Sequence, residues 1–120
     1  MPLLKCRKKT EHDSQKSIVE YFRKEFPEYI IFSTNNEACY KRKTYFTEAG
    51  MLNGLADLVI VLPNKIIFVE LKTNKGVQSK SQKEFEDKIK SLGYDYYILR
   101  SLAEFQELIK SNLEIKKCIR

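Results

Sequence analysis

The chain has 120 residues, which fits one compact domain spanning residues 1–120 with a modest hydrophobic core. Its 42% hydrophobic and 32% charged residues are typical of a globular protein, and no apolar run approaches the roughly 20 residues that a membrane span needs. The net charge of +6 and pI of about 9.2 favour a polyanionic partner.

The N-terminus lacks a long apolar segment and a cleavage-site pattern, so a secretory signal is not expected. Cys6, Cys39 and Cys118 are odd in number and widely spaced, and they lack zinc-finger spacing. They suit an intracellular, reducing compartment better than a disulfide framework. The single histidine, His12, cannot build a histidine metal cluster.

The first third of the chain predicts a basic lead, a helix and a strand. Residues 1–10 read as flexible, and apolar residues at helical spacing predict a helix over 13–26, which Pro27 ends. A strand is expected over 29–33. The long stretch 34–56 is predicted to be irregular and could hold a short strand near 44–46, and long loops in compact domains are often functional.

Within that stretch, residues 40–46 interleave three cations with three aromatic residues. Lys41, Arg42 and Lys43 are candidates for contacts with phosphates. The aromatic residues could stack on unpaired bases, or they could simply anchor an irregular surface segment to the core.

Two apolar runs, 58–62 and 66–71, predict a β-hairpin. If Asn64-Lys65 form a two-residue loop, Pro63 faces Ile66, and the residue numbers of any two facing residues add up to 129. Asp57 would then face Lys72, with Glu70 one diagonal away, and all three side chains would share one face of the hairpin. A shift by one residue would move Asp57 to the other face, so the prediction requires an odd sum.

Two carboxylates and a lysine at the open end of a hairpin predict a metal site. Carboxylate oxygens suit Mg²⁺, which can polarise a phosphoryl group and lower the pKa of a bound water. Lys72 could orient that water or stabilise developing negative charge. The alternative is a salt bridge at the end of a hairpin.

The last third predicts a loop, a helix, a strand and a second helix. The polar loop 73–78 carries Lys75 beside the site, and Ser79 or Ser81 can cap a helix that reaches Leu92. A strand over 94–99 would pair in parallel with the hairpin through this helix, giving a mixed sheet. A capping box at 101–104 starts a helix to about residue 110, and 112–120 reads as a flexible basic tail.

The ordered motifs resemble a known nuclease family. They are Gly50-x-x-x-Gly54-x-x-Asp57, Val69-Glu70-Leu-Lys72-Thr, Gly76-x-x-Ser79-x-x-Gln82 and Leu92-Gly93. From roughly residue 11 to residue 108, the chain resembles the VRR-NUC branch of the PD-(D/E)XK nucleases. Ala56 departs from that pattern, because the family has a proline before the aspartate.

This resemblance implies a restriction-endonuclease-like α/β core, in which helices flank a central mixed β-sheet. It also implies Mg²⁺ or Mn²⁺ held by Asp57, Glu70 and the backbone carbonyl of Leu71. A glutamate from the first helix would join them. Glu11 is the first choice and Glu20 the alternative, although Glu11 could equally be a favourable acid at a helix N-terminus.

Two further residues gain roles by the same resemblance. Gln82 would face the active site, although a solvated helix glutamine is the alternative. Ser79 is a candidate for contact with nucleic acid, together with the loop residue Lys75 and the basic segment.

The implied activity is that of a small structure-specific endodeoxyribonuclease that cuts branched DNA such as four-way junctions. The alternatives are a flap or restriction-like duplex nuclease with the same site, and a nucleic-acid-binding module without catalysis. By analogy with junction resolvases we expect a homodimer. Its interface could involve the final helix and the tail through Ile115 and Ile119.

Overall fold

The computed structural model describes residues 11–34, 50, 52, 54–73 and 75–119, and the side chains from residue 13 to residue 113 among them. The elements follow the predicted order of one helix, three strands, a helix, a strand and a helix. They are α2 (Glu11–Glu25), β1 (Ile30–Ser33), β2 (Leu58–Leu62), β3 (Lys65–Leu71), α4 (Lys80–Ser91), β4 (Asp95–Leu99) and α5 (Leu102–Ile119).

The four strands form one mixed sheet in the order β1-β2-β3-β4. β1, β2 and β3 pair antiparallel, whereas β3 and β4 pair in parallel, with Leu71 beside Leu99. The parallel pairing that the intervening helix predicted is therefore confirmed. It brings the C-terminal ends of β3 and β4 to the same edge of the sheet, where the connection to α4 begins.

The predicted register of the β2–β3 hairpin is wrong by two positions. Leu62 faces Lys65 and Leu58 faces Val69, so facing positions sum to 127, and the turn consists of Pro63 and Asn64. Proline has the fixed negative φ that suits the first turn position, and Asn64 adopts a φ of 60° at the second. The sum remains odd, so each side chain stays on the predicted face.

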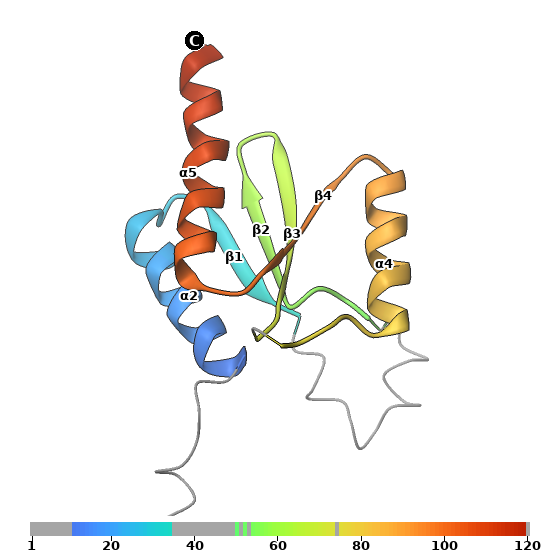
Figure 1. Cartoon of the computed structure of the whole chain (residues 1–120). Helices are drawn as coiled ribbons and strands as arrows, with labels where there is room; N and C mark the ends of the chain where they lie inside the picture. The colour runs from blue at the N-terminus through green and yellow to red at the C-terminus, as the bar shows by residue number, and fades with distance from the viewer. Residues whose placement is uncertain (1–10, 35–49, 51, 53, 74, 120) are drawn as a thin grey trace, which may run out of the picture.

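Helices cover both faces of the sheet (Figure 1). On one face, Ile18 and Phe22 of α2 and Phe105 and Ile109 of α5 are fully buried against the sheet. Burying each such side chain stabilises the fold by about 1.5–3 kcal/mol. On the other face, α4 covers a smaller cluster. Its buried members are Ala56, Ile89 and Tyr96, with Phe68, Phe85 and Ile98 packed around them.

Two helix boundaries differ from the prediction. α2 begins at Glu11, two residues early, and α5 continues to Ile119 instead of ending near residue 110. The segment after residue 110 contains no glycine or proline, so nothing in it interrupts the helix. Among the described residues, no helix is both long and apolar enough to cross a membrane.

Candidate active site

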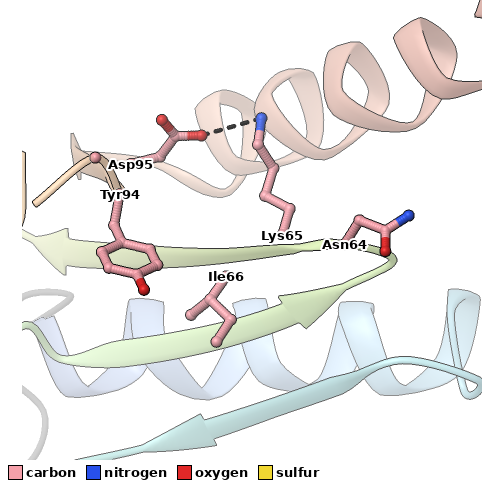
Figure 2. Close-up of a pocket in the computed structure, with 6 residues that line it drawn as sticks. Asn64, Lys65, Ile66, Tyr94 and Asp95 are labelled. Atoms are coloured by element: carbon pink, nitrogen blue, oxygen red, sulfur yellow. Dashed lines mark ion pairs between the residues drawn. The ribbon is translucent and has the colours of Figure 1, made fainter.

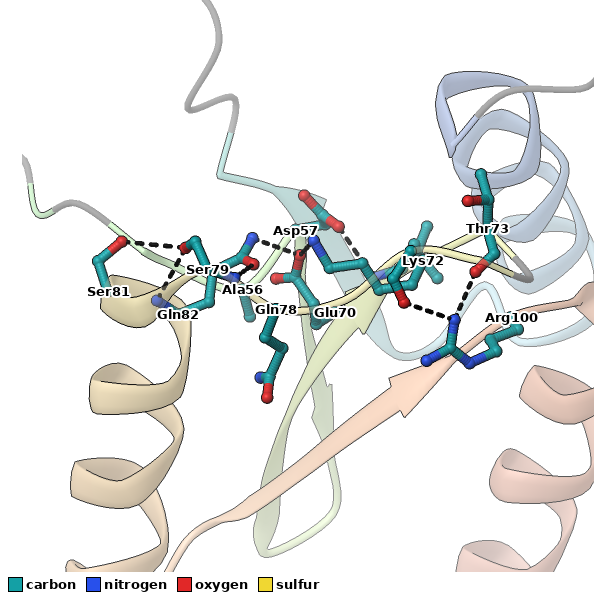
Figure 3. A network of polar contacts seen from close by, with 12 residues as sticks. Ala56, Asp57, Glu70, Lys72, Thr73, Gln78, Ser79, Ser81, Gln82 and Arg100 are labelled. Atoms are coloured by element: carbon teal, nitrogen blue, oxygen red, sulfur yellow. Dashed lines mark hydrogen bonds and ion pairs between the residues drawn. The ribbon is translucent and has the colours of Figure 1, made fainter.

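The candidate site lies at the end of the β2–β3 hairpin that is opposite its turn (Figure 3). Asp57 directly precedes β2, Glu70 is the penultimate residue of β3 and Lys72 follows β3. Gln82 comes from the first turn of α4. Backbone pairing and the start of one helix therefore bring together four side chains that are separated along the chain.

Asp57 is fixed on both sides by backbone contacts. Extending the observed register by one residue places it opposite Glu70, which corrects the predicted partner, Lys72. Its Oδ2 accepts a hydrogen bond of 2.8 Å from the N–H of Leu71, and its carbonyl accepts one of 3.1 Å from the N–H of Thr34. The carboxylate of Asp57 is thus held at the edge of β3.

Glu70 is a charged residue inside the fold, with a relative exposure of 1%. Two side chains contact its Oε2: Lys72 Nζ lies at 3.5 Å, and Gln82 Nε2 donates a hydrogen bond of 2.7 Å. Burying a carboxylate is costly unless positive charge and hydrogen-bond donors compensate it. The predicted alternative, a salt bridge, is therefore present, but it is largely buried and is shared with a glutamine.

Gln82 has a second role at the start of α4. Its Oε1 accepts from the N–H of Ser79 at 2.9 Å, and its own N–H donates to Ser79 Oγ at 3.2 Å, which completes a capping box. Of the two predicted caps, Ser79 is the residue used. The cap also fixes the orientation of the Gln82 amide, so that its NH₂ group faces Glu70.

Three further residues border the site, and two of them, Ala56 and Tyr96, are packed under α4. Tyr96 is 4% exposed, and Gln78 Nε2 donates to its hydroxyl at 3.4 Å. Burial, and secondarily the nearby charge of Glu70, raise the pKa of Tyr96 well above its ordinary value, so its hydroxyl keeps its proton. Ala56, the position at which the chain departs from the motif that it resembles, is fully buried, and its carbonyl accepts from Thr34 Oγ1 at 2.8 Å.

The other predicted site residues make no contact that the structure shows with this cluster, or lie outside the described residues. Lys75 is exposed in the β3–α4 loop, and Glu20 is exposed on α2. Glu11 begins α2, but its side chain is not among those described, and the segment 41–43 lies outside the described residues. Within the described part, no three His, Cys, Asp or Glu side chains form a metal-binding group.

The donor set fits a hard divalent cation. Asp57 and Glu70 supply carboxylate oxygens, the donors that Mg²⁺ and Mn²⁺ prefer. The next backbone carbonyl along β3, that of Leu71, is a further oxygen of the same kind.

Sequence reasoning missed Arg100, which follows β4 and donates to the backbone of the loop between β3 and α4. One feature of the sequence pointed to Arg100: it is a cation directly after the strand 94–99, which was predicted to pair in parallel with the second strand of the hairpin. Sequence reasoning also missed the contact between Gln78 and Tyr96, because the two residues lie on separate elements.

A separate pocket of about 420 Å³ lies at the turn end of the hairpin (Figure 2). Lys65 lines it and is already engaged, since its Nζ lies 3.0 Å from Asp95 Oδ2 and 2.7 Å from Asn112 Oδ1. These contacts join β3, β4 and α5. They pair the two charged side chains that line the pocket, Lys65 and Asp95, with each other.

Solved structures share this architecture. One, described as "VRR_NUC domain protein", has a TM-score of 0.70 and 17% identity, and the match covers 84% of this chain and 85% of that chain. Another, described as "VRR_NUC domain", has a TM-score of 0.58 and 19% identity, covering 84% and 96%. No family model and no curated protein matches the sequence. The chain thus has the VRR_NUC fold, which confirms the restriction-endonuclease-like α/β core that the resemblance implied.

Proposed function

We propose that this chain is a Mg²⁺- or Mn²⁺-dependent endonuclease that hydrolyses phosphodiester bonds in branched DNA such as four-way junctions. The observation that carries the proposal is the buried Glu70, which lies opposite Asp57 and is contacted by Lys72 and Gln82. A stable fold gains little from such a buried polar cluster. The VRR_NUC fold of the chain supports the same proposal.

Each residue of the cluster has a role in the proposed hydrolysis. Asp57, Glu70 and the carbonyl of Leu71 would hold the cation, which when bound polarises the phosphoryl group and activates water. Lys72 would orient the attacking water and stabilise negative charge on the phosphoryl oxygens. Gln82 would keep the Glu70 carboxylate in one orientation.

Glu11 is the proposed additional carboxylate from α2. In Figure 1 the beginning of α2 lies toward the end of the sheet from which the β3–α4 connection leaves. Glu20 lies nine residues later, which is about 13 Å further along a helix. The arrangement therefore favours Glu11 over Glu20.

DNA as the substrate is supported by charge. The net charge of +6 and the exposed Lys75 beside the site suit a phosphate backbone. Lys41, Arg42 and Lys43 would add phosphate contacts from outside the described residues. A homodimer would present two sites related by a two-fold axis, which matches the symmetry of a four-way junction.

The test is cleavage with Mn²⁺ of a four-way junction, a flap and a linear duplex of matched sequence. We expect the wild type to cut the junction fastest, and Glu70→Gln and Lys72→Ala to lose at least about 1,000-fold in rate. Glu25→Gln and Lys24→Ala make the same charge changes at exposed positions on α2 and should retain activity.

The other outcomes decide between the alternatives. Preference for the flap or the duplex, with the same loss in both variants, would retain the nuclease and replace the substrate. DNA binding without cleavage by the wild type, across metals and substrates, would identify a binding module instead.

A further inference from the structure

Arg100 follows β4 directly, and its side chain reaches the loop between β3 and α4 (Figure 3). Its Nη1 donates to the carbonyl oxygens of Thr73 and Gly76, the second at 3.0 Å. The N–H of Gly76 donates to the same Thr73 carbonyl at 3.0 Å. One guanidinium nitrogen therefore joins the two ends of the turn 73–76.

The main chain of Arg100 is itself fixed. In the parallel pair, the N–H of Lys72 donates to the carbonyl of Leu99 at 3.0 Å, which sets Arg100 beside the end of β3. The N–H of Arg100 donates to Glu104 Oε1 at 2.7 Å, and the N–H of Glu104 donates to Ser101 Oγ at 3.1 Å. Arg100 therefore extends from the anchored start of α5.

The turn that Arg100 holds lies against the stem of Lys72. A Cβ atom added at Gly76 would come within 3.4 Å of Lys72 Cδ and 3.3 Å of Thr73 Oγ1. The side chain of Lys72 is only 11% exposed, and its Nζ lies 3.5 Å from Glu70 Oε2. Movement of the turn would therefore change the space in which the Lys72 stem is confined.

We infer that Arg100 is a positioning residue that holds the turn 73–76 against Lys72, and thereby keeps the Lys72 ammonium at the buried carboxylate of Glu70. Arg100 acts on the backbone of the turn, and Lys72 is the group that acts in cleavage. The inference rests on the proposed function, because it assigns Arg100 a part in the rate of that reaction.

The chain offers a matched control. Arg23 also donates from its guanidinium to a backbone carbonyl, that of Ile31 at 3.2 Å, but it lies on α2, away from the β3–α4 loop. Arg100→Gln and Arg23→Gln therefore each remove one positive charge and a guanidinium that donates to backbone carbonyls, two of them for Arg100 and one for Arg23. Arg100→Lys retains the charge but lacks the planar guanidinium.

The first measurement is the single-turnover rate of junction cleavage at saturating enzyme with Mn²⁺. Arg100→Gln should be about 10- to 100-fold slower, because a small misplacement of a catalytic group can cost that much. Its affinity for uncleaved junction DNA in Ca²⁺ should change less than about threefold, and Arg100→Lys should be intermediate. Arg23→Gln should keep the wild-type rate, and equal rates in Arg100→Gln and Arg23→Gln would overturn the inference.

The second measurement needs no activity. Hydrogen exchange at the Gly76 amide and the NMR signal of ¹³C-methylated Lys72 report the turn and the lysine directly. Both should change in Arg100→Gln while the core amides of β3 remain protected, and neither should change in Arg23→Gln. If the wild type cuts no substrate, the proposed function fails, and this measurement still decides whether Arg100 positions Lys72. Unchanged signals in Arg100→Gln would reject that role.

Discussion

The side chain of Gln82 donates a 2.7 Å hydrogen bond to Glu70 Oε2, while its own oxygen accepts from the backbone of the α4 cap. One amide thus joins the start of a helix to a buried carboxylate on a strand. The orientation of Glu70 depends on where α4 begins, so changes at the cap are transmitted to the site.

Gln82→Glu separates the two roles of this amide. A glutamate can still accept from the N–H of Ser79, so the capping box survives. It cannot donate to Glu70, and it places a second negative charge beside it. We expect cleavage to fall by about 10- to 100-fold, and the melting temperature to fall as well, because the buried Glu70 loses a donor and gains a like charge beside it. The control Ser79→Ala should weaken the cap by about 1 kcal/mol yet retain more activity than Gln82→Glu.

Gly54→Ala tests the close approach of the segment before β2 to α4. A Cβ at Gly54 would lie 2.4 Å from the carbonyl oxygen of Ser81 and 2.9 Å from the N of Gln82, and Gly54 has a φ of +83°. Gly93 has a similar φ of +94°, with nothing within 4 Å of an added Cβ. In urea unfolding, Gly54→Ala should lose about 1–3 kcal/mol more stability than Gly93→Ala. Equal losses of stability in the two variants would mean that the positive φ, and not the close contact of Gly54 with α4, determines the loss.

Metal binding can be measured without substrate. Mn²⁺ should raise the melting temperature of the wild type, because binding to the folded state at 100 times Kd adds about 2.7 kcal/mol. Asp57→Asn keeps an oxygen that can accept from Leu71 but removes the charge, so the Mn²⁺-dependent shift should shrink. Asp95→Asn, at the far end of the hairpin, should show the full shift. A full shift in Asp57→Asn would exclude Asp57 as a ligand.

The helix carboxylate can be identified with two variants of α2. Glu11→Gln should slow cleavage about tenfold or more and raise the Mn²⁺ concentration needed for half-maximal rate, because a charged metal ligand is lost. Glu20→Gln removes the same charge further along the helix and should behave as wild type. The opposite result would assign the role to Glu20.

The raised pKa of Tyr96 predicts that the free energy of unfolding falls in alkaline solution. Its pKa is raised in the folded state, first by burial and then by Glu70, above the value of 10.0 that holds in the unfolded chain. Its contribution is therefore complete below pH 10 and is lost as the pH rises further, by at most about 1.4 kcal/mol per pH unit. Tyr96→Phe should flatten the fall in unfolding free energy above pH 10. Tyr94→Phe, at an exposed position, should not.

The hairpin illustrates how far local sequence rules reach. The apolar runs and the turn residues predicted where β2 and β3 lie. The sum of facing residue numbers is odd in both the predicted and the observed register, and this alone puts Asp57 and Glu70 on one face. The predicted loop was wrong by one residue, which shifts the pairing by two positions, because both Pro63-Asn64 and Asn64-Lys65 contain turn-forming residues. The preference of asparagine for positive φ after proline decides the register, and Lys65 is then free to contact Asp95.

Contacts between distant segments were the part that the sequence did not reveal. The capping serine before Gln82 was predictable, because its partners lie within four residues. The contact of Arg100 with Gly76 spans 24 residues and depends on the parallel pairing of β3 with β4, on the loop path and on the side-chain conformation. The pairing was predicted, but the loop path and the side-chain conformation do not follow from periodicity or composition, so the proximity of Arg100 to the site required the structure.

The burial of Glu70 places the chemistry of this chain in opposition to its thermodynamics. An aliphatic side chain at position 70 alone would leave the Lys72 ammonium, whose side chain is only 11% exposed, without its partner and would cost stability, whereas apolar residues at positions 70 and 72 together would remove the desolvation cost of both charges. Under the proposed function, descendants that cease to need cleavage would therefore lose both charges together, and the two residues found at positions 70 and 72 in a newly sequenced copy would indicate whether that copy keeps the proposed site.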